Sequence, residues 1–119
     1  MSKALRTLAF VALQQYGINQ AHLKLLSKSE HSVYRVDAQA RYTLRVFHPD
    51  LGAGYVTNLS TPAIQSELLW LRLLHEAGLG VPEPVTAKNG TQLIEISTPQ
   101  IPDGRRCTLY RWVDRKSTR

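Results

Sequence analysis

The sequence has little cysteine and no long hydrophobic run. A single cysteine, Cys107, stands among 119 residues, so no internal disulfide can form, which is typical of a reducing compartment. No apolar stretch approaches the roughly 20 residues that a membrane-spanning helix needs. The basic first six residues are followed by Gln14 and Gln15 and by no small-residue cleavage site, which argues against a secretory signal. We therefore expect a cytoplasmic protein that does not enter a membrane.

The sequence also lacks a metal-ligand pattern, and it is not strongly basic outside its C-terminal end. Its histidines are scattered without ligand spacing, and we expect them at the surface or in packing: His22, His31, His48 and His75. The formal charge is +6, but the excess lies in residues 105–119, where six basic residues accompany one acid. Such a run is typical of a solvated terminus, so nucleic acid is not the expected partner. A small nucleic-acid binder stays an alternative that rests on this tail alone.

Hydrophobic periodicity predicts a helix and then three strands. Residues 3–16 form the expected helix, ended by Gly17, because apolar residues recur at helical spacing: Leu5, Leu8, Ala9, Ala12, Leu13 and Tyr16. Strands are expected at 21–27, 32–37 and 41–47. In the third strand apolar and other residues alternate with a period of two. Short polar breaks between the strands indicate an antiparallel meander.

The second half predicts one more helix and further strands. Thr61 and Pro62 are typical of an N-cap and a first helical position, and the helix should run to about Ala77. A hairpin turn at 88–91 should join strands at 84–87 and 91–97, and a turn at 102–104 should lead into a strand at 106–113. The fold class is therefore α+β, an antiparallel sheet of about five strands with a packed helix and an N-terminal helix. We expect one domain over residues 1–113 and a disordered basic tail over 114–119.

Glu67 occupies an unusual place on the second helix. Its neighbours three and four positions away are all apolar: Ala63, Ile64, Trp70 and Leu71. An unpaired carboxylate in the middle of such a stripe would be costly, so Glu67 should have a cationic partner. Arg45, which interrupts an apolar strand, is the best candidate. The alternative is that Glu67 lies at the edge of the stripe and reaches water.

A strand cation paired with a helix glutamate is also the device by which kinases position nucleotide phosphates. Five segments, in order, resemble the N-terminal lobe of the aminoglycoside phosphotransferase and homoserine kinase-like family. They correspond to its first hairpin, its cation-bearing strand, its pairing helix, its connector and the hinge between lobes: Leu25–Val36, Tyr42–Val46, Ser66–Leu71, Val81–Val85 and Leu109–Val113. The resemblance implies a nucleotide-binding lobe of a protein-kinase-like fold.

The resemblance also implies roles for individual residues. Residues 27–32 would form the phosphate-covering turn, although they contain no glycine. Backbone N–H groups and the hydroxyls of Ser27, Ser29 and Ser32 would serve there instead. Arg45 would contact the phosphates of ATP and Glu67 would orient it. Backbone groups of Tyr110, Arg111 and Trp112 would meet the adenine edge, the alternative being an ordinary edge strand with aromatic packing.

The residues for phosphoryl transfer itself are missing. In the resembled family a His-Gly-Asp-x-His-x-x-Asn segment and a later Asp supply the catalytic base and hold magnesium, and nothing here matches. His48-Pro49-Asp50 is followed five positions later by Tyr55 rather than Asn. We therefore name no catalytic and no metal-binding residue, and expect Mg²⁺ only with the missing lobe. The basic end of the chain suggests a truncated or frameshifted reading frame or a deliberately shortened chain.

Two functions follow as hypotheses. The chain is expected to be the nucleotide-binding lobe of an ATP-dependent phosphotransferase that acts on a hydroxyl of a small molecule. In the alternative, the lobe serves as a non-catalytic interaction or dimerisation module. An apolar face exposed around the hinge strand would then dock on a separate chain or on a second copy. Cys107 is expected to be a buried structural thiol rather than a nucleophile.

Overall fold

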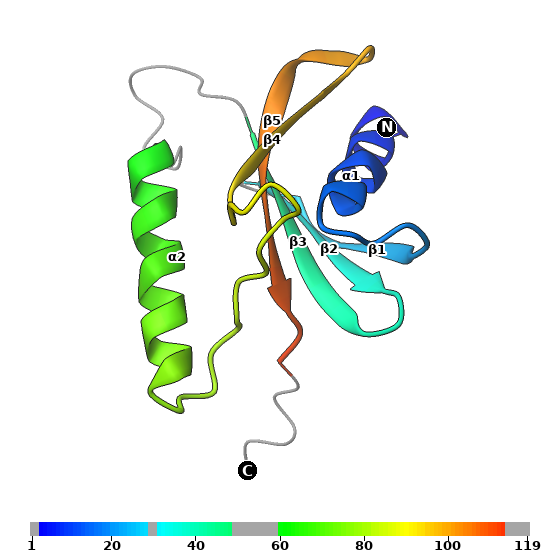
Figure 1. Cartoon of the computed structure of the whole chain (residues 1–119). Coiled ribbons are helices and arrows are strands. Elements are labelled where there is room, and N and C mark those ends of the chain that lie inside the picture. The colour runs from blue at the N-terminus through cyan, green and yellow to red at the C-terminus, as the bar shows by residue number, and fades with distance from the viewer. Residues whose placement is uncertain (1–2, 29–30, 49–59, 114–119) are drawn as a thin grey trace.

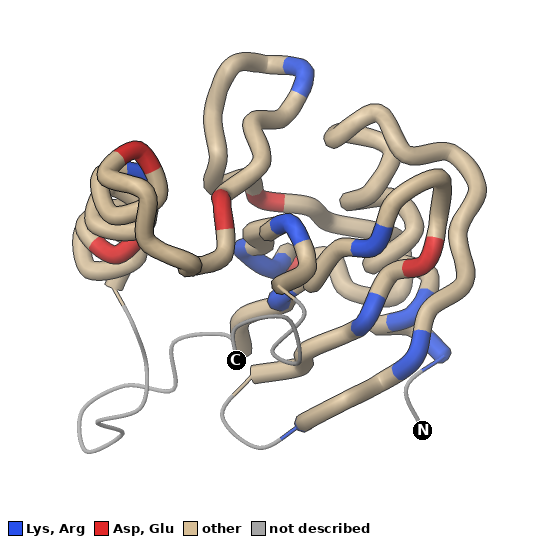
Figure 2. Tube along the Cα trace, turned by 90° about the horizontal axis from the view of Figure 1, so that it is seen from below, with Lys and Arg blue, Asp and Glu red and all other residues tan. Residues whose placement is uncertain are grey.

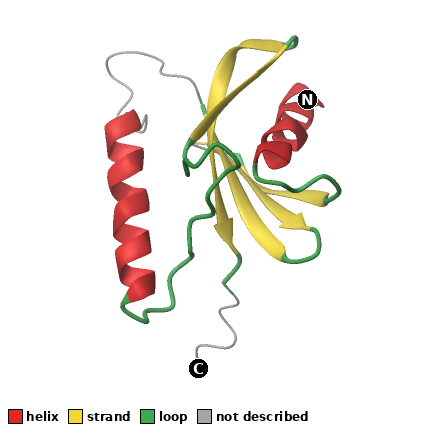
Figure 3. Ribbon diagram, in the orientation of Figure 1, coloured by secondary structure: helices red, strands yellow, loops and turns green. Residues whose placement is uncertain are grey.

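The computed structural model describes residues 3–28, 31–48 and 60–113. Expectations for Ser29, for residues 49–59 and for the tail at 114–119 lie outside these described residues. The element order is α1 (Lys3–Gln15), β1 (His22–Ser27), β2 (His31–Asp37), β3 (Arg41–Phe47), α2 (Thr61–Glu76), β4 (Ile94–Thr98) and β5 (Ile101–Arg111). Figure 3 shows the strands as one twisted sheet between two helices. The expected α+β class is confirmed.

The sheet has five strands in the order β1-β2-β3-β5-β4, and every neighbouring pair is antiparallel. The first three strands form the expected meander. The last strand is inserted between β3 and β4, so β3 lies at the centre of the sheet. This order brings Val33 of β2 and Thr108 of β5 to either side of Arg45.

One face of the sheet packs against α1 and forms the main core. The largest fully buried side chains of this cluster are Leu8, Leu13, Tyr34, Leu44, Leu109, Val36 and Val46. Helix α1 stops just before Gly17, whose φ of 85° suits glycine. There the N–H of Gly17 donates to the carbonyl of Gln14, and that of Ile18 donates to the carbonyl of Leu13. These two bonds are those of a Schellman motif, and they fix where the helix ends.

The other face of the sheet packs against α2. Figure 1 shows the two helices on opposite sides of the sheet. Only two residues of α2, Ile64 and Leu68, are buried, and they form a small cluster with Phe47 and Tyr110. The outer side of the helix leaves Trp70 64% exposed. Within the described residues, neither helix combines the length and the apolar content that crossing a membrane requires.

Three local expectations from the sequence are wrong. The N-cap of α2 is Ser60 rather than Thr61, because the Ser60 hydroxyl accepts the N–H of Ala63. The expected strand at 84–87 is reduced to a single bridge at Pro84, since a proline has no N–H to donate to a ladder. The expected turn at 102–104 lies inside β5, which starts at Ile101. The chain instead reverses direction between Thr98 of β4 and Ile101 of β5, which are paired.

Candidate functional site

The face of the sheet toward α2 carries an arginine at its centre. Side chains alternate along a strand, so Leu44 and Val46 join the α1 core while Arg45 and Phe47 face α2. Nη1 of Arg45 lies 3.2 Å from Oε2 of Glu67. The expected ion pair between β3 and α2 is therefore present.

The surroundings of Glu67 differ from the expectation. Its side chain is 42% exposed, whereas that of Arg45 is 17% exposed. The buried stripe of α2 runs through Ile64 and Leu68, and Trp70 points to solvent, so Glu67 lies at the edge of the stripe. A pair this accessible contributes about 0.2–1 kcal/mol to stability. Its effect is to set the direction of the guanidinium more than to hold the fold together.

Arg45 has further hydrogen bonds on both sides. Its Nε donates to Nε2 of His31 at 3.2 Å, and its Nη1 donates to the hydroxyl oxygen of Tyr110 at 3.3 Å. The Tyr110 hydroxyl also bonds to Thr108 Oγ1 at 3.0 Å. Burial raises the pKa of Tyr110 above its ordinary value, so the phenol stays protonated at neutral pH. Arg45 is thus held by one residue from each of β2, β5 and α2.

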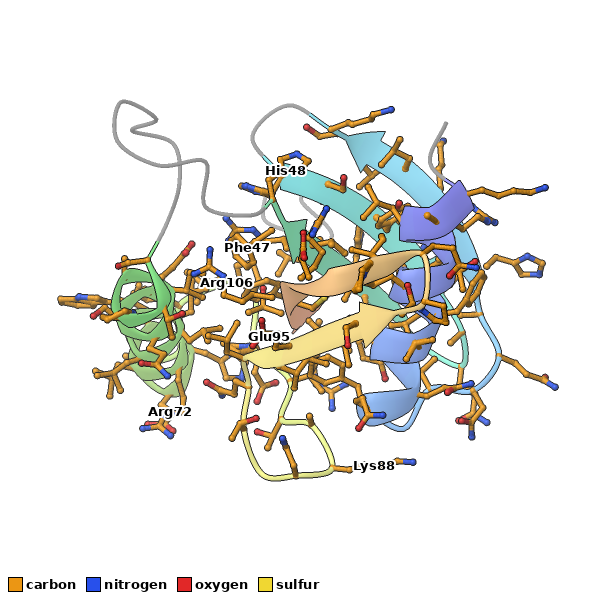
Figure 4. All side chains as sticks on the ribbon, turned by 90° about the horizontal axis from the view of Figure 1, so that it is seen from above. Phe47, His48, Arg72, Lys88, Glu95 and Arg106 are labelled. Atoms are coloured by element: carbon orange, nitrogen blue, oxygen red, sulfur yellow. The ribbon has the colours of Figure 1, made fainter. Side chains whose placement is uncertain are left out.

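An aromatic ring and a second arginine extend this arrangement. The guanidinium carbons of Arg45 and Arg106 lie 4.9 and 5.9 Å from the centre of the Phe47 ring. The His31 ring lies 5.3 Å from the same ring. Figure 4 shows Phe47 and Arg106 close together near the end of β3, and Figure 2 shows Lys and Arg positions along the strands. Such a concentration of cations, in which Glu67 pairs with Arg45, is suited to binding an anion such as phosphate.

Comparison with known proteins gives similarity only at the level of structure. No protein-family model matches the sequence, and no curated protein matches it. Among solved structures, a microcompartment-associated aminopropanol kinase is similar, with a TM-score of 0.72 and 28% identity over 91% of this chain. An amicoumacin kinase, hAmiN, in complex with AMP-PNP and Ca²⁺ is similar over 95% of this chain, with a TM-score of 0.64 and 20% identity.

The chain has the fold of a kinase N-terminal lobe. The expected resemblance to aminoglycoside phosphotransferase-like kinases is confirmed. The matches cover 31% and 34% of the two kinases, so this chain spans about a third of their length. The similarity therefore concerns the N-terminal lobe, and it does not extend to the activity of a complete kinase.

The structure does not bring all the expected phosphate-binding residues of this kinase-like lobe together. Ser27 is exposed at the end of β1. Ser32 is 1% exposed, and its hydroxyl has no hydrogen-bond partner among the described residues. Because Ser32 and Arg45 occupy positions of opposite parity in the β2–β3 register, the Ser32 side chain enters the α1 core. Its hydroxyl is thus directed away from Arg45.

The hinge strand of the lobe makes bonds within the chain through both side chains and backbone groups. The side chain of Tyr110 bonds to Arg45. The backbone N–H of Arg111 donates to the carbonyl of Glu83 at 2.9 Å, and that of Trp112 donates to the carbonyl of Arg41 at 3.1 Å. Both donors are therefore already bonded in this structure. The guanidinium of Arg111 pairs with Glu83 at 3.3 Å.

Sequence reasoning missed three residues of the site, namely His31, Thr108 and Arg106. Their positions depend on the order of the strands, because Thr108 comes beside Arg45 only when β5 is inserted next to β3. A partial signal was present. His31 has the same parity as Val33, which is the register partner of Arg45. A paired β2–β3 hairpin would therefore have placed His31 on the Arg45 face.

Proposed function

We propose that this chain is the nucleotide-binding lobe of an ATP-dependent phosphotransferase that acts on a hydroxyl group of a small molecule. The observation that carries the proposal is the ion pair between Arg45 and Glu67 at 3.2 Å. In a lobe of this fold, the pair fixes a forked, permanently charged guanidinium on the face of the sheet where phosphates bind. The likeness to an AMP-PNP-bound kinase supports ATP as the ligand.

The chain's own residues would bind and orient the nucleotide, not transfer its phosphoryl group. Arg45 would bond to phosphate oxygens, and Glu67 and Tyr110 would hold its direction. The chemistry needs a carboxylate base and magnesium ligands, and the 119 residues contain no His-Gly-Asp-x-His-x-x-Asn segment. Those groups, the bound Mg²⁺ and the choice of acceptor would come from a second lobe. The pure 119-residue chain should therefore bind ATP weakly and transfer no phosphate.

An NMR titration of the chain with Mg-ATP tests the proposal. Amide shifts should concentrate on the residues flanking the β1–β2 turn, on Arg45 and on 108–113. Arg45→Ala should weaken binding about tenfold or more, because a charge-assisted bond to phosphate is lost. Arg72→Ala, which removes an exposed arginine from α2, is the matched control and should leave affinity unchanged. Shifts spread over unrelated surfaces, or equal effects of the two variants, would contradict a nucleotide site.

One observation favours a second candidate, a non-catalytic module that docks on another copy of this chain. The hinge strand does not supply the expected apolar face, since Leu109 and Tyr110 are buried. Helix α2 instead exposes Leu69, Trp70 and Leu73 on its outer side at 48, 64 and 46%. A module of this kind would self-associate in the same samples and show no localised shift with nucleotide.

A further inference from the structure

His31 lies beside Arg45, on the same face of the sheet. It opens β2 directly after the turn that the kinase resemblance assigns to the phosphates. Its imidazole is on the Arg45 face of the sheet, with Nε2 3.2 Å from Nε of Arg45 and its ring against Phe47. A side chain at this point meets whatever anion Arg45 binds.

The hydrogen bond from Arg45 indicates the protonation state of the imidazole in the chain without nucleotide. A guanidinium only donates, so Nε2 of His31 must carry the lone pair and the ring is neutral. A phosphate oxygen reverses this preference, because a nearby negative charge favours the imidazolium form. Histidine is the side chain that makes this change near neutral pH.

We infer that His31 is a second phosphate-binding residue, which takes up a proton from solvent when the nucleotide binds. The bond from Arg45 Nε–H to His31 Nε2 breaks. Nε2 gains the proton and donates it in a hydrogen bond to a phosphate oxygen, while Arg45 Nε–H turns to the phosphate as well. This inference rests on the proposed function. It adds a second cation to the proposed site, the His31 imidazolium, which forms only when the nucleotide is bound.

Among the described residues, the other charged groups around the imidazole do not supply this proton switch. Arg45 and Arg106 stay charged at all accessible pH values. The Glu67 carboxylate is bonded to Arg45, and Tyr110 remains a protonated phenol. His48 follows Phe47 at the end of β3, and Lys28 precedes the turn. Replacing His48 by Gln therefore serves as a control for a neighbouring histidine.

The test measures Mg-ATP affinity of the 119-residue chain from pH 8 to pH 6 for the wild type and three variants. Between pH 8 and pH 6, the factor by which affinity increases should be about ten times larger for the wild type than for His31→Gln. A tenfold difference is what a change of one unit in the pKa of His31 on binding produces. Glutamine keeps an acceptor for Arg45 and leaves only the nucleotide's own titration near pH 6. His31→Lys, which is always charged, should bind at pH 8 as tightly as the wild type binds at pH 6. His48→Gln should follow the wild type.

The His31 Cε1–H signal gives an independent readout. Its midpoint in an NMR pH titration should move to higher pH when Mg-ATP is present. Identical pH curves for the wild type and His31→Gln would overturn the inference. If Arg45→Ala still weakened binding in that case, the nucleotide site would stand without His31. If the wild type bound no nucleotide, the proposed function would fail together with this inference.

Discussion

Two buried tyrosines on opposite faces of the sheet show how a single hydroxyl can position Arg45. The Tyr110 hydroxyl accepts from Arg45 and bonds to Thr108, whereas the Tyr34 hydroxyl has no hydrogen-bond partner among the described residues. Tyr110→Phe should lower the free energy of unfolding by about 1–2 kcal/mol, because it leaves Thr108 without its partner. It should also weaken Mg-ATP binding about threefold by freeing Arg45. Urea unfolding and calorimetric titration measure the two effects.

Tyr34→Phe is the matched control at this scale. Tyr34 is 2% exposed, so the substitution removes a buried hydroxyl without disturbing a bond to any described residue. It should leave the free energy of unfolding unchanged or raise it, and should not alter nucleotide affinity. Equal losses in both variants would mean that the Tyr110 hydroxyl does not hold Arg45.

At the scale of elements, α2 is attached to the sheet through few buried side chains. It buries only Ile64 and Leu68, so its local capping matters more than it would for a well-packed helix. The Ser60 hydroxyl accepts the Ala63 N–H at 3.2 Å. Ser60→Ala should cost about 1 kcal/mol, which corresponds to about fivefold faster hydrogen exchange of the α2 amides. Exchange of β3 and β5 amides should be unchanged.

Ser66→Ala tests the same change of residue type within the helix. Ser66 is exposed and lies in the interior of α2, where alanine is the better helix former. In Ser66→Ala, the amides of α2 should exchange at the same rate as in the wild type or more slowly. If Ser60→Ala and Ser66→Ala had the same effect on exchange, the Ser60 hydroxyl would not be capping α2.

The elements that local pattern determines were predictable from the sequence. Helical spacing over residues 3–16 and the alternation around Arg45 gave α1 and the first three strands within a residue or two. The insertion of β5 beside β3 was not predictable, because strand order is set by long-range packing that one sequence does not display. The ion pair of Arg45 with Glu67 followed from charge among apolar neighbours. The exposure of Glu67 did not, since it depends on how α2 is rotated against the sheet.

At the scale of the whole molecule, Cys107 reports on the entire sheet. It is fully buried in β5, where it pairs with Val46 on one side and Ile94 on the other. Reaction of its thiol with a disulfide reagent should therefore require separation of β5 from both neighbours. The ratio of the rates in the unfolded and the native chain should equal the equilibrium constant for folding, [N]/[U], from a urea titration. A ratio far smaller than that constant would show that β5 opens locally, and Cys107→Ala should not react at all.

The same thiol couples stability to alkaline pH. Burial raises the pKa of Cys107 to about 12 in the folded chain, whereas an unfolded cysteine titrates near 8.5. Above pH 8.5 the unfolded chain releases a proton that the folded chain keeps, so the free energy of unfolding falls as pH rises toward 12. Buried tyrosines act in the same direction only from about pH 10, their ordinary pKa. Between pH 8 and 9.5 the decline should therefore belong to Cys107, and Cys107→Ala should flatten it in urea titrations across that range. A decline unchanged in Cys107→Ala would assign the pH dependence to another group.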